Sequence, residues 1–144
     1  MIEERAVLSA ISLVAEQSFF AWTEPAPPGA AIAGTGVWWQ ASVAFEGPLA
    51  GRLTFALPDA LARQLHASFL GLDPDEPIAE AALEDCLGEF ANMSCGAWLT
   101  SLEQDRCFVL QRPTVQRLDA GPECGAAAVV MVNDAPVVVH SSLG

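Results

Sequence analysis

A long, unbroken helical pattern at residues 78–102 constrains the fold of this chain more than any other feature. With about 3.6 residues per turn, one side of this helix collects the large apolar residues. We expect that side to face the core, with these members: Leu83, Leu87, Phe90, Ala91, Ser94 and Trp98. A helix with such a face must pack against other elements, which predicts a layered domain.

The opposite side of the same helix carries a narrow polar stripe of Asp85, Glu89, Asn92 and Gly96. Successive members are spaced so that they lie above one another on a helix. A carboxylate and a carboxamide therefore stand side by side on an exposed ridge, beside a glycine that leaves room for close approach. Asparagine is unfavourable in mid-helix, which makes a functional role worth testing. The alternative from spacing alone is an ordinary solvated face.

Hydrophobic periodicity and turn residues predict further helices and strands around this helix. The helices are 3–22 and 59–70, and the strands are 37–45, 49–57, 107–110, 114–118, 126–132 and 137–140. Turns at 46–48 and at Asn133 and Asp134 predict antiparallel hairpins. The fold class is therefore α/β (α+β layered), with helices packed on a mostly antiparallel sheet. We expect residues 1–144 to form a single domain.

Two adjacent tryptophans, Trp38 and Trp39, fall within one predicted strand. Neighbouring side chains of a strand point to opposite faces of the sheet. We expect one indole to enter the core and the other to lie under a helix or in a subunit interface.

The charge of the chain limits its partners. The net charge is −12, and no lysine accompanies the six arginines. This balance excludes nucleic acid and anionic membranes as partners. Acidic residues are concentrated between Asp73 and Glu89, where they would steer a partner with a basic rim or simply favour a helix N-terminus. No secretory signal or membrane-spanning run is visible, so we expect a cytoplasmic protein.

The cysteines show no close-paired spacing typical of a metal site. Together with His66 and His140 they could assemble a zinc site, and the four are Cys86, Cys95, Cys107 and Cys124. Reduced thiols that pack as small apolar groups are the expected alternative in a cytoplasmic protein. We therefore predict no metal site.

The segment 82–96 resembles the signature helix of the chemotaxis phosphatases of the CheC/CheX/FliY family. That signature places an acid or serine, a glutamate and an asparagine as Asp85, Glu89 and Asn92 stand here. The likeness covers residues 48–139, including the hairpin 49–55 and the segment 111–115. CheC-type members carry two such motifs, whereas this chain has one, which fits the CheX branch. Local departures from the family are bulky or unusual residues at Cys86, Phe90, Cys95 and Trp98.

This resemblance implies a function. The substrate would be the aspartyl phosphate of a phosphorylated CheY-like response regulator. Asn92 would orient the attacking water, and Glu89 would pair with the lysine of the receiver domain. Asp85, Gly88 and Gly96 would serve docking. The chain would need no cofactor of its own, because the receiver supplies Mg²⁺.

The resemblance also implies a homodimer built through the sheet. Two alternatives stay open for the function. One is a non-catalytic adaptor of the same fold that binds a receiver or a flagellar switch component. The other is an unrelated helix-on-sheet domain that carries the motif by chance.

Overall fold

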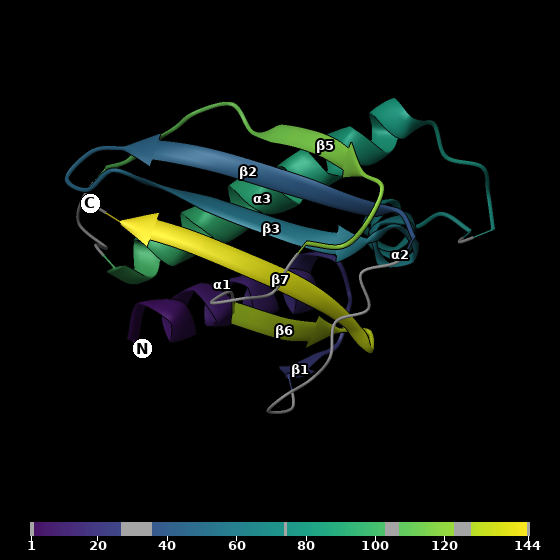
Figure 1. The fold of residues 1–144 in the computed structure, drawn as a ribbon, viewed down its shortest axis with the longest axis horizontal. Coiled ribbons are helices and arrows are strands. Elements are labelled where there is room, and N and C mark those ends of the chain that lie inside the picture. The colour runs from purple at the N-terminus through teal and green to yellow at the C-terminus, as the bar shows by residue number, and fades with distance from the viewer. Residues whose placement is uncertain (1, 27–35, 74, 103–106, 123–127, 144) are drawn as a thin grey trace.

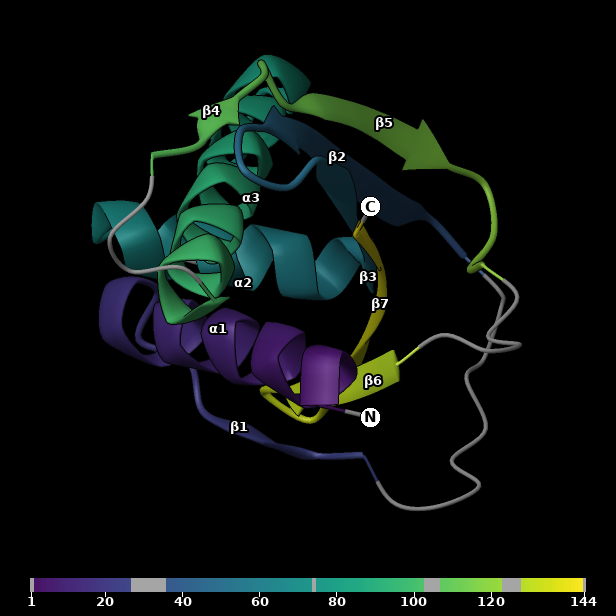
Figure 2. The same cartoon turned by 90° about the vertical axis from the view of Figure 1, so that its left-hand side faces the viewer.

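The computed structural model describes residues 2–26, 36–73, 75–102, 107–122 and 128–143. It places three helices on one face of an antiparallel sheet (Figures 1 and 2), which confirms the expected fold class. None of the described helices is long and apolar enough to cross a membrane. The elements in chain order are α1 (Ile2–Ser18), β1 (Thr23–Pro25), β2 (Trp38–Glu46), β3 (Gly51–Pro58), α2 (Asp59–Leu70), α3 (Glu80–Leu102), β4 (Val109–Leu110), β5 (Thr114–Leu118), β6 (Ala128–Val132) and β7 (Ala135–Leu143).

The sheet runs in the order β1-β6-β7-β3-β2, and both β4 and β5 pair with the free side of β2. Every recorded pairing is antiparallel. In Figure 2 the helices lie together on one side of the curved sheet. Because β5 pairs with β2, the connection that precedes β5 is brought back alongside α3.

Helix α2 and the β6–β7 hairpin are confirmed, and residues next to each of them in the sequence set their limits. Helix α2 begins after Pro58 and ends at Gly71, which adopts the left-handed conformation with φ 68°. The hairpin of β6 and β7 turns at Asn133 and Asp134, whose φ values are 49° and 66°. Positive φ at both central residues is what the tight hairpin turn requires.

The first helix ends earlier than predicted, at Ser18 instead of residue 22, and Phe20 has a φ of 56°. The chain then forms β1, a strand that the sequence pattern did not predict. The cause is a distant partner. Trp22 donates its backbone N–H to Asn133 Oδ1 at 3.0 Å, and Asn133 donates its own to the Trp22 carbonyl at 2.9 Å.

Helix α3 begins at Glu80, two residues later than predicted. Its first turn is closed on the carbonyl of Ala79, which accepts from the backbone N–H groups of Ala82 and Leu83. Pro77 therefore lies before the helix. The first residues of the predicted strand 126–132 lie outside the described part of the chain.

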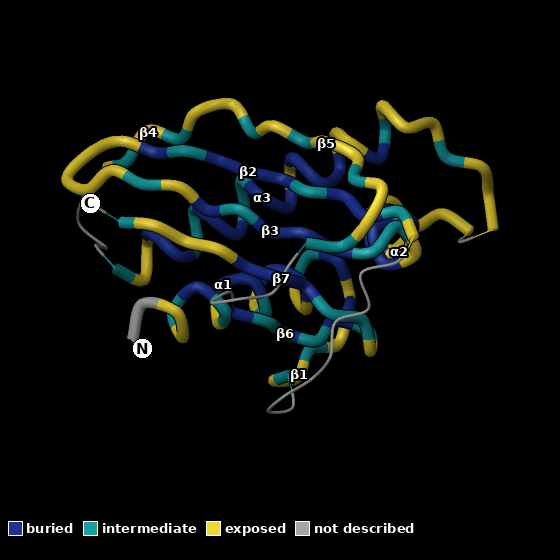
Figure 3. Tube along the Cα trace, in the orientation of Figure 1, coloured by how far each residue is buried: buried dark blue, intermediate teal, exposed yellow. Residues whose placement is uncertain are grey.

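The core fills the space between the helices and the inner face of the sheet, where the trace in Figure 3 is mostly buried. The whole predicted core face of α3 is buried, as expected. Phe90 lies at the centre, with ring centroids 4.8 Å from Phe19 of α1 and 5.2 Å from Phe55 of β3. Helix α3 is thus held between α1 and the sheet, which fixes its outward ridge.

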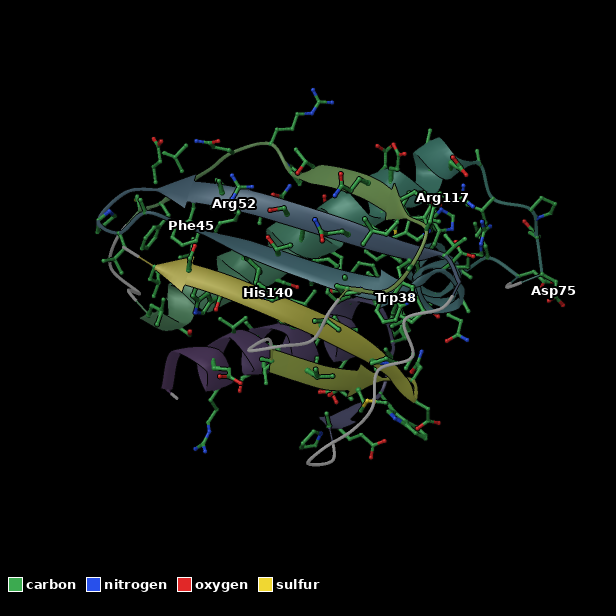
Figure 4. The ribbon with its side chains drawn as sticks, viewed as in Figure 1. Trp38, Phe45, Arg52, Asp75, Arg117 and His140 are labelled. Carbon is green, nitrogen blue, oxygen red and sulfur yellow. The ribbon has the colours of Figure 1, made fainter. Side chains whose placement is uncertain are left out.

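Trp38 and Trp39 do point to opposite faces. Trp39 enters the core. Trp38, labelled in Figure 4, is 2% exposed and packs on the other face with Ala56 and Val138. The expected cover, a helix or a second subunit, is wrong. The backbone at Gly121 lies over the indole so closely that a Cβ there would come within 2.8 Å of the ring.

Asp59, the first residue of α2, accepts two hydrogen bonds, one from β2 and one from within its own helix. Trp39 Nε1 donates to Asp59 Oδ1 and Arg63 Nε donates to Oδ2, both at 2.8 Å. Partial burial acts to raise the pKa of Asp59, but the hydrogen bonds from Arg63 and Trp39 outweigh it and hold the pKa below its ordinary value. A carboxylate with a lowered pKa stabilises the fold above its unfolded pKa, about 4, and loses that contribution as the pH falls through the folded value.

We therefore expect Asp59→Asn to lower the free energy of unfolding by about 1 kcal/mol at pH 7. The loss should be smaller at pH 3, because the stability contributed by a lowered pKa declines once the pH is below the unfolded pKa. Urea unfolding at both pH values measures the difference, with Asp119→Asn at an exposed site as the control. An equal loss at pH 7 and pH 3 would contradict the linkage.

Candidate functional site

The polar stripe predicted from the sequence lies on the outward side of α3. Asp85 and Glu89 are exposed, and Asn92 and Gly96 are partly exposed. Neither carboxylate has an ion pair with a residue that the structure describes. The ion pair in the described part of the chain joins Arg63 to Asp59 within α2. The ridge therefore presents acceptor groups and an amide to the surroundings.

The ridge forms one wall of a groove of about 410 Å³. Asp85, Gly88, Glu89 and Asn92 line it, together with Glu84 one residue before Asp85. The structure thus brings together four of the five site residues predicted from the sequence. Gly96 lies farther along the helix and does not line the groove.

The connection between β4 and β5 forms the other wall, through Arg112 and Pro113. A Cβ on Gly88 would lie 3.3 Å from Pro113 Cγ, so this glycine allows the connection to lie against α3. Gly88 is accordingly buried within the chain. A Cβ on Gly96, by contrast, would meet nothing within 4 Å.

The sequence reasoning did not assign Arg112 and Pro113 to the site. In the sequence, the segment 111–115 stands out only through the family resemblance. Its position opposite Glu89 depends on the pairing of β5 with β2, which joins Thr114 to Ser42 and Val115 to Ala41. No local pattern encodes that pairing.

The thiols near the ridge are suited to packing. Cys86 and Cys95 are buried on the inner side of α3. Burial raises the pKa of Cys86 to about 11, with a smaller contribution from the Glu89 charge, and raises that of Cys95 to about 12. Both are therefore protonated at neutral pH. Within the described ranges no three His, Cys, Asp or Glu residues gather as a metal site would require, and Cys124 lies outside those ranges.

The family model described as "Chemotaxis phosphatase CheX" matches residues 39–128. Among solved structures, CheX from Desulfovibrio desulfuricans is 18% identical over 100% of both chains, with a TM-score of 0.72. CheX from Vibrio vulnificus is 16% identical over 100% of both chains, with a TM-score of 0.71. The CheX–CheY–BeF₃–Mg²⁺ complex from Borrelia burgdorferi matches at 17% identity and a TM-score of 0.66, over 96% of both chains. No curated protein matches the chain.

These structural identities are low and establish a shared fold. The family match carries more, because it spans more than half of the chain. It includes α2, α3, β4 and β5, and with them both walls of the groove. This chain therefore belongs to the family of the chemotaxis phosphatase CheX.

Proposed function

We propose that this chain hydrolyses the aspartyl phosphate of a CheY-type receiver domain. The observation that carries the proposal is the joint exposure of Glu89 and Asn92 at one groove, with a buried core face fixing the helix beneath them. The family to which the chain belongs supports the reaction class. The structural relative from Borrelia burgdorferi, which is a complex with CheY, BeF₃ and Mg²⁺, supports the partner class.

Asn92 orients the attacking water in this proposal. Phosphoryl transfer requires little covalent chemistry from the protein, so positioning and charge stabilisation dominate. The amide carbonyl oxygen can accept a hydrogen bond from water while the NH₂ group donates to a neighbouring acceptor. Because an amide takes up no proton in this range, Asn92 acts as an orienting group and not as a general base.

Glu89 pairs with the lysine of the receiver and so sets the docking register. A charge-assisted hydrogen bond between the two would be both strong and directional. Asp85, on the same ridge, adds acidic docking surface. Mg²⁺ comes with the receiver, and this chain contributes the amide and the carboxylates.

The acidic segment before α3 should influence the rate of encounter. Asp75 lies within the connection from α2 to α3, at its outermost point in Figure 4, and Glu76 beside it is also exposed. We expect the double reversal Asp75→Lys, Glu76→Lys to slow association with the receiver about tenfold at low salt, with kcat unchanged. Stopped-flow association at two salt concentrations measures this, with Glu4→Lys as a reversal on α1. An equal effect of both variants would contradict local steering.

A substitution at Gly96 should affect stability and docking in different ways. Alanine there fills open space in the isolated chain and improves helix propensity, so Gly96→Ala should raise the free energy of unfolding by about 1 kcal/mol. If the glycine admits the receiver, the same variant should nevertheless have a higher KM. Gly88→Ala is the matched comparison, because its Cβ would crowd Pro113 and forfeit the gain. A more stable Gly96→Ala with unchanged KM would remove Gly96 from the docking surface.

The direct test charges a panel of receiver domains with acetyl phosphate and follows phosphate release with and without this protein. Faster release from one or more receivers supports the proposal. Binding that depends on phosphorylation, without faster release, would favour the non-catalytic adaptor instead. Neither binding nor release on any receiver would overturn both.

We also propose a homodimer, which rests on the family resemblance, and a cytoplasmic location, which rests on the sequence analysis above. Sedimentation equilibrium over a range of concentrations tests the first. A mass of one chain at all concentrations would contradict the dimer.

A further inference from the structure

The two walls of the groove beside α3 carry opposite charges. Three carboxylates, on Glu84, Asp85 and Glu89, lie along the helix wall. Among the residues that the structure describes, Arg112 is the basic side chain that lines the groove, and it belongs to the opposite wall. An approaching molecule therefore meets negative charge on one side and positive charge on the other.

The guanidinium group of Arg112 has no ion-pair partner within the described part of the chain. Arg112 is exposed, and no ion pair or hydrogen bond of its guanidinium group is recorded there. The other arginines of the described sheet differ in this respect. Arg52 donates to Ser42 Oγ at 3.0 Å, and the charge of Arg117 acts on Asp59. Arg112 is thus placed to serve a partner.

The backbone that carries Arg112 is held on both sides. Gln111 donates its backbone N–H to the Ala44 carbonyl at 2.8 Å. Pro113 packs against Gly88, and Thr114 then pairs with Ser42 in the sheet. The base of the Arg112 side chain is consequently fixed relative to the ridge, which lowers the entropy cost of using it for docking.

We propose that Arg112 is a docking residue of this groove, whose guanidinium binds an anionic oxygen of the receiver while Glu89 binds its lysine. The anionic oxygen belongs to the phosphoryl group or to a carboxylate beside it. The inference rests on the proposed function and deepens it, since it names a second, oppositely charged contact. A planar guanidinium suits both kinds of oxyanion through paired hydrogen bonds.

Two contacts of opposite sign fix orientation as well as affinity. If the receiver turned end for end, its lysine would face Arg112 and its anionic group would face Glu89. Like charges brought together in this way oppose the wrong pose. Asn92 lies on the Glu89 side of the groove, so the correct pose is the one that brings the phosphoryl group to a defined distance from the amide.

The kinetic test compares Arg112→Ala, Arg112→Lys and Arg112→Glu on a receiver that the wild type dephosphorylates. We expect Arg112→Ala to raise KM about tenfold, with kcat within about twofold of wild type. Lysine should restore part of the loss, and glutamate should deepen it. Arg5→Ala removes the same charge from α1 and is the matched control. Urea midpoints of all variants check that the fold is intact.

A binding test separates the two sources of the anionic oxygen and the two proposals. Affinity is measured by calorimetry for the receiver with and without beryllofluoride. A loss in Arg112→Ala confined to the loaded receiver indicates the phosphoryl group, and an equal loss in both forms indicates a carboxylate. KM and affinity equal to those of Arg5→Ala would overturn the role of Arg112 and leave the phosphatase standing. Weaker binding by Arg112→Ala, with no phosphate release by wild type, would support Arg112 and overturn the hydrolysis.

Discussion

Replacing Asn92 by alanine should remove most of the phosphate release while the receiver still binds. We expect kcat to fall about a hundredfold to a thousandfold, the usual cost of losing one positioning or charge-stabilising group. KM should change little, because Glu89 and the rest of the groove keep their contacts. The alanine should not disturb the fold, since Asn92 is only partly buried on the outward side of α3. Steady-state phosphate release and receiver affinity measure the two effects separately.

Two controls define this result. Gln64→Ala removes a carboxamide from an exposed site on α2 and should leave kcat unchanged. Glu89→Ala should mainly raise KM, because it removes a docking contact. If Asn92→Ala kept the kcat of the wild type, the water-orienting role would be wrong even if the chain proved to be a phosphatase.

Replacing Phe90 by alanine should cost about 3–5 kcal/mol in the free energy of unfolding, as expected for a large aromatic side chain deleted from a packed core. Phe90 is 1% exposed and contacts the rings of Phe19 and Phe55. The cavity would open between α1, α3 and β3. Because Phe90 follows Glu89 directly, it also anchors the ridge from beneath.

An exposed phenylalanine, Phe20, offers a control for that prediction. Phe20 is 75% exposed, so Phe20→Ala should change stability by about 0.5 kcal/mol or less. Chemical denaturation of both variants at the same pH gives the comparison. Losses of similar size for Phe90→Ala and Phe20→Ala would contradict the packing of α3 described above.

The elements that the sequence predicted well are those whose limits are set by nearby residues. Pro58 and Gly71 bound α2, and Asn133 and Asp134 make the turn between β6 and β7. The apolar face of α3 was also predictable, because helical periodicity sorts its side chains without reference to the rest of the chain.

The features that the sequence did not predict correctly depend on contacts between distant segments. Strand β1 forms because Trp22 meets Asn133, which is far away in the sequence. Trp38 is covered by the backbone at Gly121 for the same reason. These contacts depend on which segments the sheet brings together, and no window of local sequence contains that information.

One wall of the candidate site could be predicted from local sequence, and the other could not. The ridge of Asp85, Glu89 and Asn92 follows from helical spacing alone, although spacing does not say what the ridge does. That meaning came from the family resemblance. Arg112 required the structure, since β5 must pair with β2 before the second wall exists.

Hydrolysis by this protein is decided by the lifetime of the aspartyl phosphate in a receiver that it binds. A receiver labelled with radioactive phosphate is mixed with a saturating excess of the protein, and the label remaining on the receiver is followed in time. We expect the wild type to shorten this lifetime, and Asn92→Ala, bound to the same extent, to shorten it about a hundredfold to a thousandfold less effectively. An unchanged lifetime with saturating wild type would contradict the account and make the chain a binding domain.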